Sequence, residues 1–227
     1  MIELGQFDEE AILAEAEAQY ATDDPAATLD AAHAALIVVD MIDEFVRPRW
    51  SPYWIPEATR QVPRVGRVAA AFRAARRPVV YLAYEVGLRG LNFPTPAVPI
   101  GAAARSYADR IFQRVAICPD LAPGPDDLVV LKHTYSGFHG TALDAVLRGL
   151  EVDTVVICGT MTNFCCGATA REAYWHGYQV VFGSDINSTD DPELHVAELR
   201  TLRRGYARIA TAADILEGLP SPGPTPP

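Results

Sequence analysis

Short runs of apolar residues alternate along the chain with segments whose apolar positions recur at helical spacing. The continuous apolar runs predict strands over 34–39, 78–83, 128–131, 154–158, 179–182 and 207–210. Helical spacing predicts helices over 56–77, 141–150, 163–177 and 192–204. Because buried strands separated by helices are typical of parallel sheets with right-handed crossovers, the pattern predicts one six-stranded parallel sheet that is buried on both faces.

The remaining segments differ in composition from this regular part. Residues 1–30 are acidic and predict a helical arm, whereas residues 220–227 are Pro-rich and predict a disordered tail. Residues 87–127 are rich in Pro and Gly and predict loops with a short helix near 102–107. We therefore expect a single domain over 31–219, with no internal repeat.

Composition and charge exclude several classes of protein. The chain has 227 residues, of which 49% are hydrophobic and 21% charged, as in globular proteins. Its formal net charge of −10 argues against nucleic-acid partners, which need clustered Lys and Arg. The N-terminus is acidic where a signal peptide would be basic, and no apolar run reaches the ~18 residues of a membrane span. We expect a cytoplasmic protein that does not bind membranes.

The four cysteines are Cys118, Cys158, Cys165 and Cys166, and their spacing is not that of a zinc ribbon. The adjacent pair is poorly placed to form a mutual disulfide bond. Reduced thiols are therefore the simplest interpretation.

Cys165 has the position of a candidate nucleophile. It follows the predicted strand 154–158 and a turn that begins at Gly159, and it stands at the start of a predicted helix. Free backbone N–H groups and the positive end of a helix dipole favour thiolate over thiol. The alternative is that Cys165 is a small buried residue where helix meets sheet, because buried free cysteines are common.

Two charged residues end other predicted strands. Asp40 follows the first strand and Lys132 follows the third, so both are expected at the carboxyl edge of the sheet with Cys165. Singly, Asp40 is explained as a cap of the next turn and Lys132 as a side chain that leaves the sheet for solvent. Together they indicate chemistry, because buried charges are costly unless they are paired or used.

Four segments, in this order along the chain, carry a resemblance to a known family. They are 36–41 with Phe45, 131–132 with 135–138, 159–171, and Gly177-Tyr178 leading to Ser184-Asp185. The chain from Ala34 to Leu216 thereby resembles the isochorismatase-like cysteine hydrolases, which include nicotinamidases, carbamoyl-amidases and ureidoacrylate hydrolases. The resemblance implies an isochorismatase-like hydrolase domain over 31–219 with a three-layer α/β/α, Rossmann-like fold.

The resemblance also implies a catalytic triad of Asp40, Lys132 and Cys165. In that family the acid is the base, the lysine supports it, and the cysteine forms an acyl-enzyme. A non-proline cis peptide is typical before the nucleophile, and by position it links Thr160 to Met161 here. It would aim the N–H groups of Met161 and Cys165 at one oxyanion. Cys166 matches a position that is usually apolar.

Departures from the family pattern bear on the substrate. The common Asp-Met-Gln-Asn motif reads Asp-Met-Ile-Asp at 40–43, and the segment after the second strand has no histidine before His133, so we expect no metal and no cofactor. The nucleophilic cysteine favours cleavage of the C–N bond of a small amide, carbamoyl or ureido compound. The alternatives are an isochorismatase-type vinyl ether hydrolase that uses Asp40 alone and a catalytically silent small-molecule-binding protein.

The residues that would contact the small-molecule substrate are the least defined part of the prediction. An aromatic-lined pocket with one arginine for a carboxylate suits a small planar ligand, although such residues are more often core, interface or surface. The candidates are Phe45, Trp50, Tyr84, Tyr135, Phe138 and Arg105. Because members of the family commonly assemble, we expect a homodimer or a homotetramer.

Overall fold

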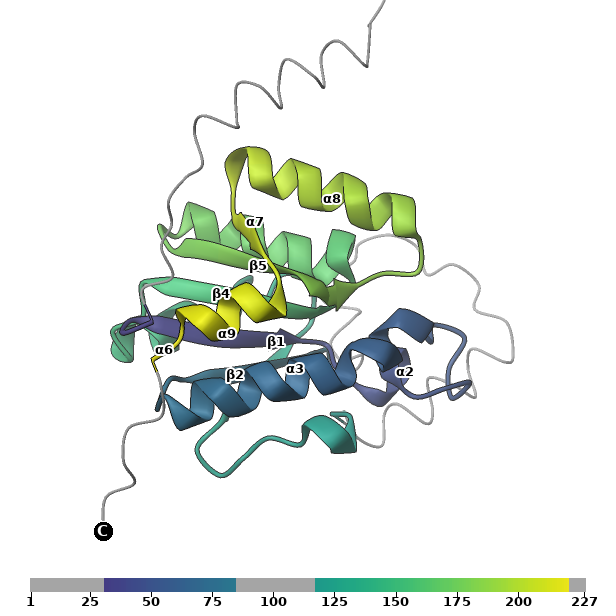
Figure 1. The fold of residues 1–227 in the computed structure, drawn as a ribbon, viewed down its shortest axis with the longest axis horizontal. Helices are drawn as coiled ribbons and strands as arrows, with labels where there is room; N and C mark the ends of the chain where they lie inside the picture. The colour runs from purple at the N-terminus through teal and green to yellow at the C-terminus, as the bar shows by residue number, and fades with distance from the viewer. Residues whose placement is uncertain (1–30, 85–116, 221–227) are drawn as a thin grey trace, which may run out of the picture.

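The computed structural model describes residues 31–84 and 117–220 and places a single six-stranded parallel sheet between two layers of helices (Figure 1). The strands are β1 (Ala34–Val39), β2 (Val79–Tyr84), β3 (Leu128–Lys132), β4 (Thr154–Thr160), β5 (Gln179–Ser188) and β6 (Arg208–Ala210). Their order is β3-β2-β1-β4-β5-β6. This is the doubly wound, Rossmann-like order, so the predicted fold class is confirmed.

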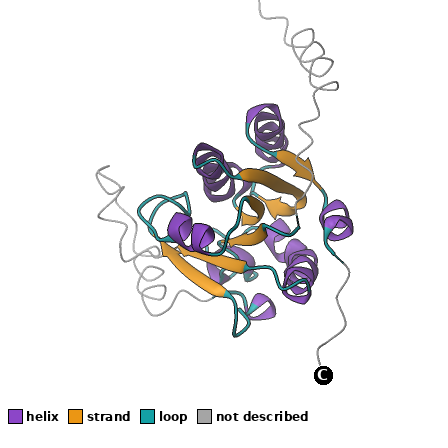
Figure 2. Cartoon of the chain, turned by 90° about the vertical axis from the view of Figure 1, so that its left-hand side faces the viewer, coloured by secondary structure: helices purple, strands orange, loops and turns teal. Residues whose placement is uncertain are grey.

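Helices cover both faces of this sheet (Figure 2). They are α2 (Asp43–Val46), α3 (Pro56–Ala74), α6 (Leu143–Gly149), α7 (Gly167–Trp175), α8 (Pro192–Gly205) and α9 (Ala212–Gly218), with a 3-10 turn η2 (Pro119–Leu121) and a π-helical turn η3 (Thr162–Cys166). One apolar cluster joins α3 and α9 to one face of the sheet. A second cluster joins α6, α7 and α8 to the other face. The residues of β1 alternate between the two clusters and are all fully buried.

Most predicted elements are present, and the differences have local causes. The helix predicted over 163–177 is divided into η3 and α7, and β5 continues six residues beyond the predicted end at Phe182. The helix α9 was not predicted. It begins with a capping box in which Thr211 and Asp214 bind each other's backbone N–H groups, and this pair was the available sequence signal. The predicted arm, tail and short helix near 102–107 lie outside the described residues.

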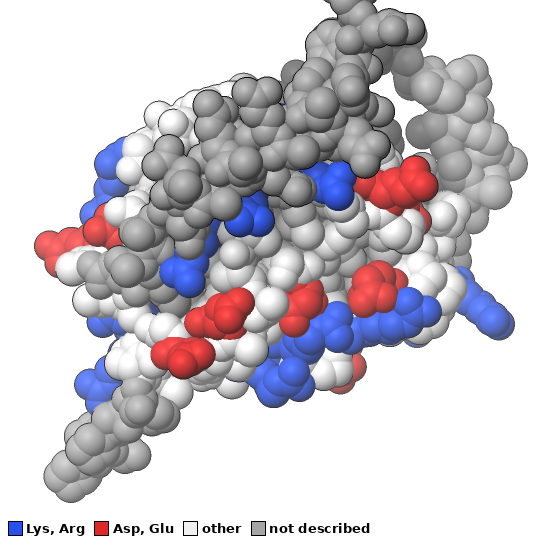
Figure 3. Space-filling model, turned by 45° about the horizontal axis from the view of Figure 1, so that its top comes forward, with Lys and Arg blue, Asp and Glu red and all other residues white. Residues whose placement is uncertain are grey.

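The face of the described part that Figure 3 shows is mixed in charge. On the face shown in Figure 3, acidic and basic side chains lie next to one another. In the described ranges, none of the helices combines the length and the apolar character that a membrane crossing requires.

The strands β1 and β4 are neighbours in the sheet. After β1 the chain adds β2 and β3 on one side of this pair, and after β4 it adds β5 and β6 on the other side, so the switch point of the sheet lies between β1 and β4. Val39, the last residue of β1, is in register with Gly159 of β4 and Leu82 of β2. Ligands of open α/β sheets bind beyond the carboxyl ends of the strands at such a point. Residues that follow β1 and β4 therefore have the position of a binding site.

Candidate active site

Asp40, Lys132 and Cys165 lie together at the carboxyl edge of the sheet. Lys132 Nζ is 2.7 Å from Asp40 Oδ2 and donates a hydrogen bond of 3.3 Å to Cys165 Sγ. The side chains of Asp40 and Lys132 are fully buried, and Cys165 is 7% exposed. The three residues that were predicted from separate strand ends thus form one buried cluster.

Asp40 is positioned by the end of β1. Its N–H donates to the Leu82 carbonyl (2.9 Å), so the pairing with β2 extends to this residue. Its φ of 47° then turns the chain away from the sheet. A left-handed conformation is uncommon in a residue other than glycine, although Asp tolerates it better than most. The turn directs the carboxylate into the cluster instead of along the strand.

Lys132 ends β3, two strands away from β1, and its long side chain spans the distance to Asp40. Its ammonium also donates to the Thr134 carbonyl (3.0 Å) and lies 5.1 Å from the centre of the Tyr84 ring, which is in register on β2. Burial lowers the pKa of Lys132, but the negative charge of Asp40 and the nearby Cys165 outweigh it and raise the pKa above its ordinary value. Lys132 is therefore a buried ammonium with compensating partners.

The turn that carries Cys165 is built on a close approach between β4 and β1. The register of β4 against β5 shifts between Ile157 and Gly159, and the peptide bond between Thr160 and Met161 is cis. The buried Gln61 side chain of α3 donates to the Gly159 carbonyl (2.8 Å). After the turn, the Cys166 N–H donates to the Met161 carbonyl (3.1 Å), which closes the wide first turn of η3. Cys165 is held inside this turn.

Replacing Gly159 with alanine is expected to unfold this edge of the sheet. Gly159 has a φ of +131°, and an added Cβ would lie 2.0 Å from the Val39 carbonyl oxygen. Backbone strain and overpacking together predict a loss of at least about 3 kcal/mol in the free energy of unfolding, measured by urea denaturation. The matched control is Gly149→Ala, because nothing lies within 4 Å of a Cβ added there. Equal stability of the two variants would contradict the expectation.

The surroundings of Cys165 act in two directions on the pKa of its thiol. Burial raises the pKa of the Cys165 thiol, the negative charge of Asp40 raises it further, and the ammonium of Lys132 lowers it only in part. Burial and the neighbouring carboxylate thus act against the effect of a helix start and favour the thiol over the thiolate. A thiol in this position needs a base before it can attack.

The other three cysteines are buried and free. Burial raises the pKa of Cys158, Cys166 and Cys118. Cys166 belongs to the apolar cluster beneath α7, which agrees with its assignment to the core. Cys165 differs from these thiols because it is hydrogen bonded to a buried ammonium.

The predicted substrate contacts separate into different environments. Tyr135 and Phe164 are 44% and 41% exposed, and their rings pack with centroids 5.4 Å apart. Phe164 directly precedes Cys165. Tyr135 directly follows Thr134, whose carbonyl accepts a hydrogen bond from Lys132. This aromatic pair therefore connects the two chain segments that carry the thiol and the ammonium. Phe164 was not among the predicted contacts.

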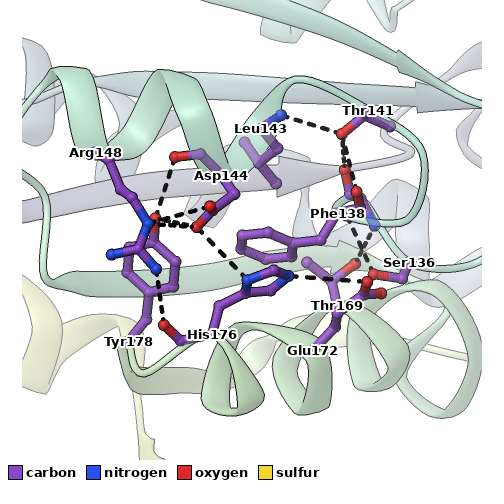
Figure 4. Close-up of polar contacts among 11 residues, drawn as sticks. Ser136, Phe138, Thr141, Leu143, Asp144, Arg148, Thr169, Glu172, His176 and Tyr178 are labelled. Carbon is purple, nitrogen blue, oxygen red and sulfur yellow. Dashed lines mark hydrogen bonds and ion pairs between the residues drawn. The ribbon is translucent and has the colours of Figure 1, made fainter.

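Phe138 lies in a separate aromatic and polar cluster between α6 and α7 (Figure 4). Its ring is buried, stacks on His176 at 5.2 Å and packs against Tyr178 at 5.7 Å. Asp144 accepts a hydrogen bond from Tyr178 (2.9 Å) and forms an ion pair with Arg148 (3.0 Å). These contacts place Phe138 among the packing residues of this cluster.

The remaining predicted contacts are only partly described. Phe45 packs, half-buried, against the core beneath α3, and Trp50 is half-buried in the segment between α2 and α3. Tyr84 lies over Lys132, as described above. Arg105 lies outside the described residues. Within the ranges 31–84 and 117–220, no group of three or more His, Cys, Asp or Glu side chains is arranged to hold a metal ion.

Several residues that hold the site were not predicted. The Thr169 hydroxyl donates to the Cys165 carbonyl (2.6 Å) and accepts from the Gly137 N–H (3.0 Å), which joins α7 to the loop after β3. Thr162, at the start of η3, is hydrogen bonded to His195 of α8 (2.9 Å). The contacts of Thr169 with Gly137 and of Thr162 with His195 join residues about thirty positions apart, so local sequence patterns carry no signal for them.

A doubly wound parallel sheet with a buried cysteine, lysine and aspartate at its switch point is the arrangement of an α/β cysteine hydrolase. Residues 34–214 match the isochorismatase domain, and the chain belongs to this family. It is 30% identical to a cysteine hydrolase from Pseudomonas syringae pv. phaseolicola 1448A, whose crystal structure matches with a TM-score of 0.69 over 84% of this chain and 94% of that chain.

Two relatives of known activity are similar to this chain in different ways. Nicotinamidase 3 of Arabidopsis thaliana is 45% identical over 86 residues, which cover 38% of this chain and 43% of that protein. The chain thus spans less than half the length of that relative. The ureidoacrylate amidohydrolase RutB of Methylobacterium radiotolerans is 29% identical over 218 residues, which cover 86% of this chain and 84% of that protein.

Proposed function

We propose that this protein is a cysteine-dependent hydrolase that cleaves the C–N bond of a small amide, carbamoyl or ureido compound through an acyl-enzyme. The observation that carries the proposal is the position of Lys132 Nζ, 2.7 Å from Asp40 Oδ2 and 3.3 Å from Cys165 Sγ. A carboxylate, an ammonium and a thiol in one buried cluster support the roles of base and nucleophile that we propose for Asp40 and Cys165. The names of the nicotinamidase and ureidoacrylate amidohydrolase relatives support the bond type.

Acylation begins with Cys165 as a thiol, because burial raises its pKa. Asp40 takes the thiol proton while Sγ forms a bond to the substrate carbonyl carbon, and the carbonyl oxygen becomes an oxyanion. Lys132 keeps the total charge of the buried cluster balanced as the negative charge moves from Asp40 to the substrate. The C–N bond then breaks, and the leaving amine takes the proton from Asp40.

The turn that carries Cys165 supplies the proposed oxyanion hole, and Asp40 activates the water of the hydrolytic step. The N–H groups of Met161 and Cys165, on either side of Thr162, are the proposed donors to the oxyanion, and each such donor supplies about 3 kcal/mol or more to the tetrahedral intermediate. After the amine leaves, Asp40 takes a proton from water, and the hydroxide attacks the acyl carbon. The thioester bond breaks, the sulfur recovers its proton from Asp40, and the product acid is released.

Asp40→Asn tests the assignment of the base. An amide accepts no proton at this position, so acylation is expected to fall by about 10²- to 10⁴-fold. A panel of small amides, ureides and carbamoyl acids is first screened for ammonia release by the wild type. Formation of the acyl-enzyme is then followed by rapid-quench intact-mass spectrometry, with circular dichroism to verify folding. A normal acylation burst in the folded variant would remove Asp40 from the mechanism.

A further inference from the structure

We propose that His195 of α8 is a positioning residue for Cys165, acting through the hydroxyl of Thr162. The inference rests on the proposed function, since it concerns the placement of the nucleophile. Among the described residues, His195 forms hydrogen bonds with Thr162 and Ser184 and with none of the three residues of the cluster. It is hydrogen bonded to the first residue of η3, the five-residue turn that contains Cys165.

The two ring nitrogens of His195 have distinct partners. Nε2 lies 3.1 Å from the Ser184 carbonyl oxygen of β5, and Nδ1 lies 2.9 Å from Thr162 Oγ1. A carbonyl only accepts hydrogen bonds, so Nε2 carries a proton. In the neutral ring Nδ1 is then the acceptor for the Thr162 hydroxyl. His195 thereby connects the Ser184 carbonyl of the sheet to the buried Thr162 side chain of η3, which we call the nucleophile turn because it contains Cys165.

The packing of α8 makes this connection important. Among the residues of this 14-residue helix only Leu202 is buried, so apolar contacts hold its N-terminal half weakly. Polar contacts join the segment 189–198 to the nucleophile turn and α7 instead. Thr189 donates to Asn163 Oδ1 (2.7 Å), and Glu198 forms an ion pair with Arg171. Of these three contacts, the His195–Thr162 hydrogen bond is the one that binds the first residue of η3.

The location of Thr162 explains why its orientation matters for the reaction. It stands one residue beyond the cis peptide bond between Thr160 and Met161 and three residues before Cys165, between the two proposed N–H donors to the oxyanion. A misplacement of reacting groups by about 1 Å costs about 10²-fold in rate. Loss of the His195 contact should therefore change the rate of acylation more than the binding of substrate.

Two variants of His195 separate this role from a purely structural one. In His195→Asn, the side-chain amide superposes on the Nδ1 edge of the ring and accepts from Thr162. In His195→Gln, the amide reaches the Nε2 position and donates to Ser184. We expect His195→Asn to keep kcat within about 3-fold of wild type and His195→Gln to lose about 10- to 100-fold in kcat, with KM changed by less than about 3-fold.

Thr162→Val provides the second side of a double-mutant cycle, because it removes the hydroxyl and keeps the shape of the side chain. It should lower kcat as much as His195→Gln does. The double variant Thr162→Val/His195→Gln should have a kcat no lower than that of either single variant. Thermal unfolding of all variants reports any general loss of stability. Equal losses in the Asn and Gln variants, wild-type kcat in the Gln variant, or additive losses in the cycle would overturn the proposal.

Alkylation of Cys165 by iodoacetamide, followed by mass spectrometry, gives a measurement that needs no substrate. It should be at least about 3-fold slower in His195→Gln and Thr162→Val and unchanged in His195→Asn, because Sγ moves away from Asp40, the proposed base that takes its proton as the sulfur attacks. Equal rates in all variants would overturn the positioning role even in an active enzyme. Absence of wild-type ammonia release on the substrate panel, with the alkylation pattern as expected, would instead overturn the proposed function.

Discussion

Cys165→Ser is expected to lower turnover by at least about 10³-fold while the protein stays folded. The hydroxyl has nearly the shape of the thiol, but it is a much weaker acid, so Asp40 cannot activate it to a similar extent. The measurement is the steady-state rate of ammonia release, combined with thermal unfolding.

The neighbouring cysteine supplies a matched control. Cys166 is fully buried and belongs to the core beneath α7, so Cys166→Ala should lower stability modestly and leave turnover within about 3-fold of wild type. Near wild-type turnover in Cys165→Ser would end the nucleophile assignment. Retained hydrolysis of a vinyl ether by Cys165→Ala would favour a mechanism that uses Asp40 alone.

Most of the fold could be predicted from sequence because β1 to β5 each contain a run of at least three apolar residues. The expected burial on both faces was wrong for β3, whose Leu128, Val129 and Leu131 are exposed in this edge strand. The six residues of β1 are fully buried on both faces of the sheet, which is why they show no alternation of polar and apolar positions. The chain segments that form the site could be predicted from sequence for a related reason. In a parallel sheet the carboxyl ends of all strands meet at one edge, so Asp40 and Lys132 were expected to lie near one another and near Cys165.

The direction in which the site shifts the pKa of the Cys165 thiol could not be predicted in this way. The sequence shows that Cys165 stands near a helix start, but the balance between burial, Asp40 and Lys132 depends on distances that appear only in three dimensions. The divided helix could not be predicted either, because η3 is closed by a hydrogen bond from the Cys166 N–H to the Met161 carbonyl that no sequence pattern marks. Long-range hydrogen bonds such as Thr162 to His195 leave no periodic signal.

Substrate contacts were the weakest prediction because an aromatic residue serves core and pocket equally well. Phe138 and Tyr135 are three residues apart, yet one is buried in the cluster of Figure 4 and the other is exposed beside Phe164. Sequence spacing does not distinguish these environments. The aromatic pair next to Cys165 is where a change of specificity should be sought first.

Lys132→Met is expected to have the largest effect on stability. Methionine has a similar shape, but it leaves the Asp40 carboxylate fully buried without the ammonium that lies 2.7 Å away in the wild type. Removal of one partner from a buried ion pair costs about 3–5 kcal/mol in the free energy of unfolding. Urea denaturation at neutral pH measures this loss, and turnover should be lost at the same time.

The double variant Asp40→Asn/Lys132→Met separates the cost of an unpaired charge from the loss of packing. Because it buries no charge, it should recover most of the stability that Lys132→Met loses, although it should remain inactive. A double variant as unstable as Lys132→Met would show that the aliphatic side chain of Lys132, and not its charge, holds this edge of the sheet. Full stability of Lys132→Met would contradict a buried ion pair altogether.

The pH dependence of stability provides an independent check of the same pair. Burial lowers the pKa of Lys132, but Asp40 raises it by more, so the folded-state pKa lies above the ordinary value of 10.5. A group with a raised pKa contributes its full stability below the unfolded pKa and loses it as pH rises through the folded pKa. The difference in unfolding free energy between wild type and the double variant should therefore be flat between about pH 6 and 8 and should shift against the wild type only above about pH 10.5. A decline that begins near neutral pH would mean that Lys132 is not held as an ammonium, and the charge balance proposed for acylation would then need another cation.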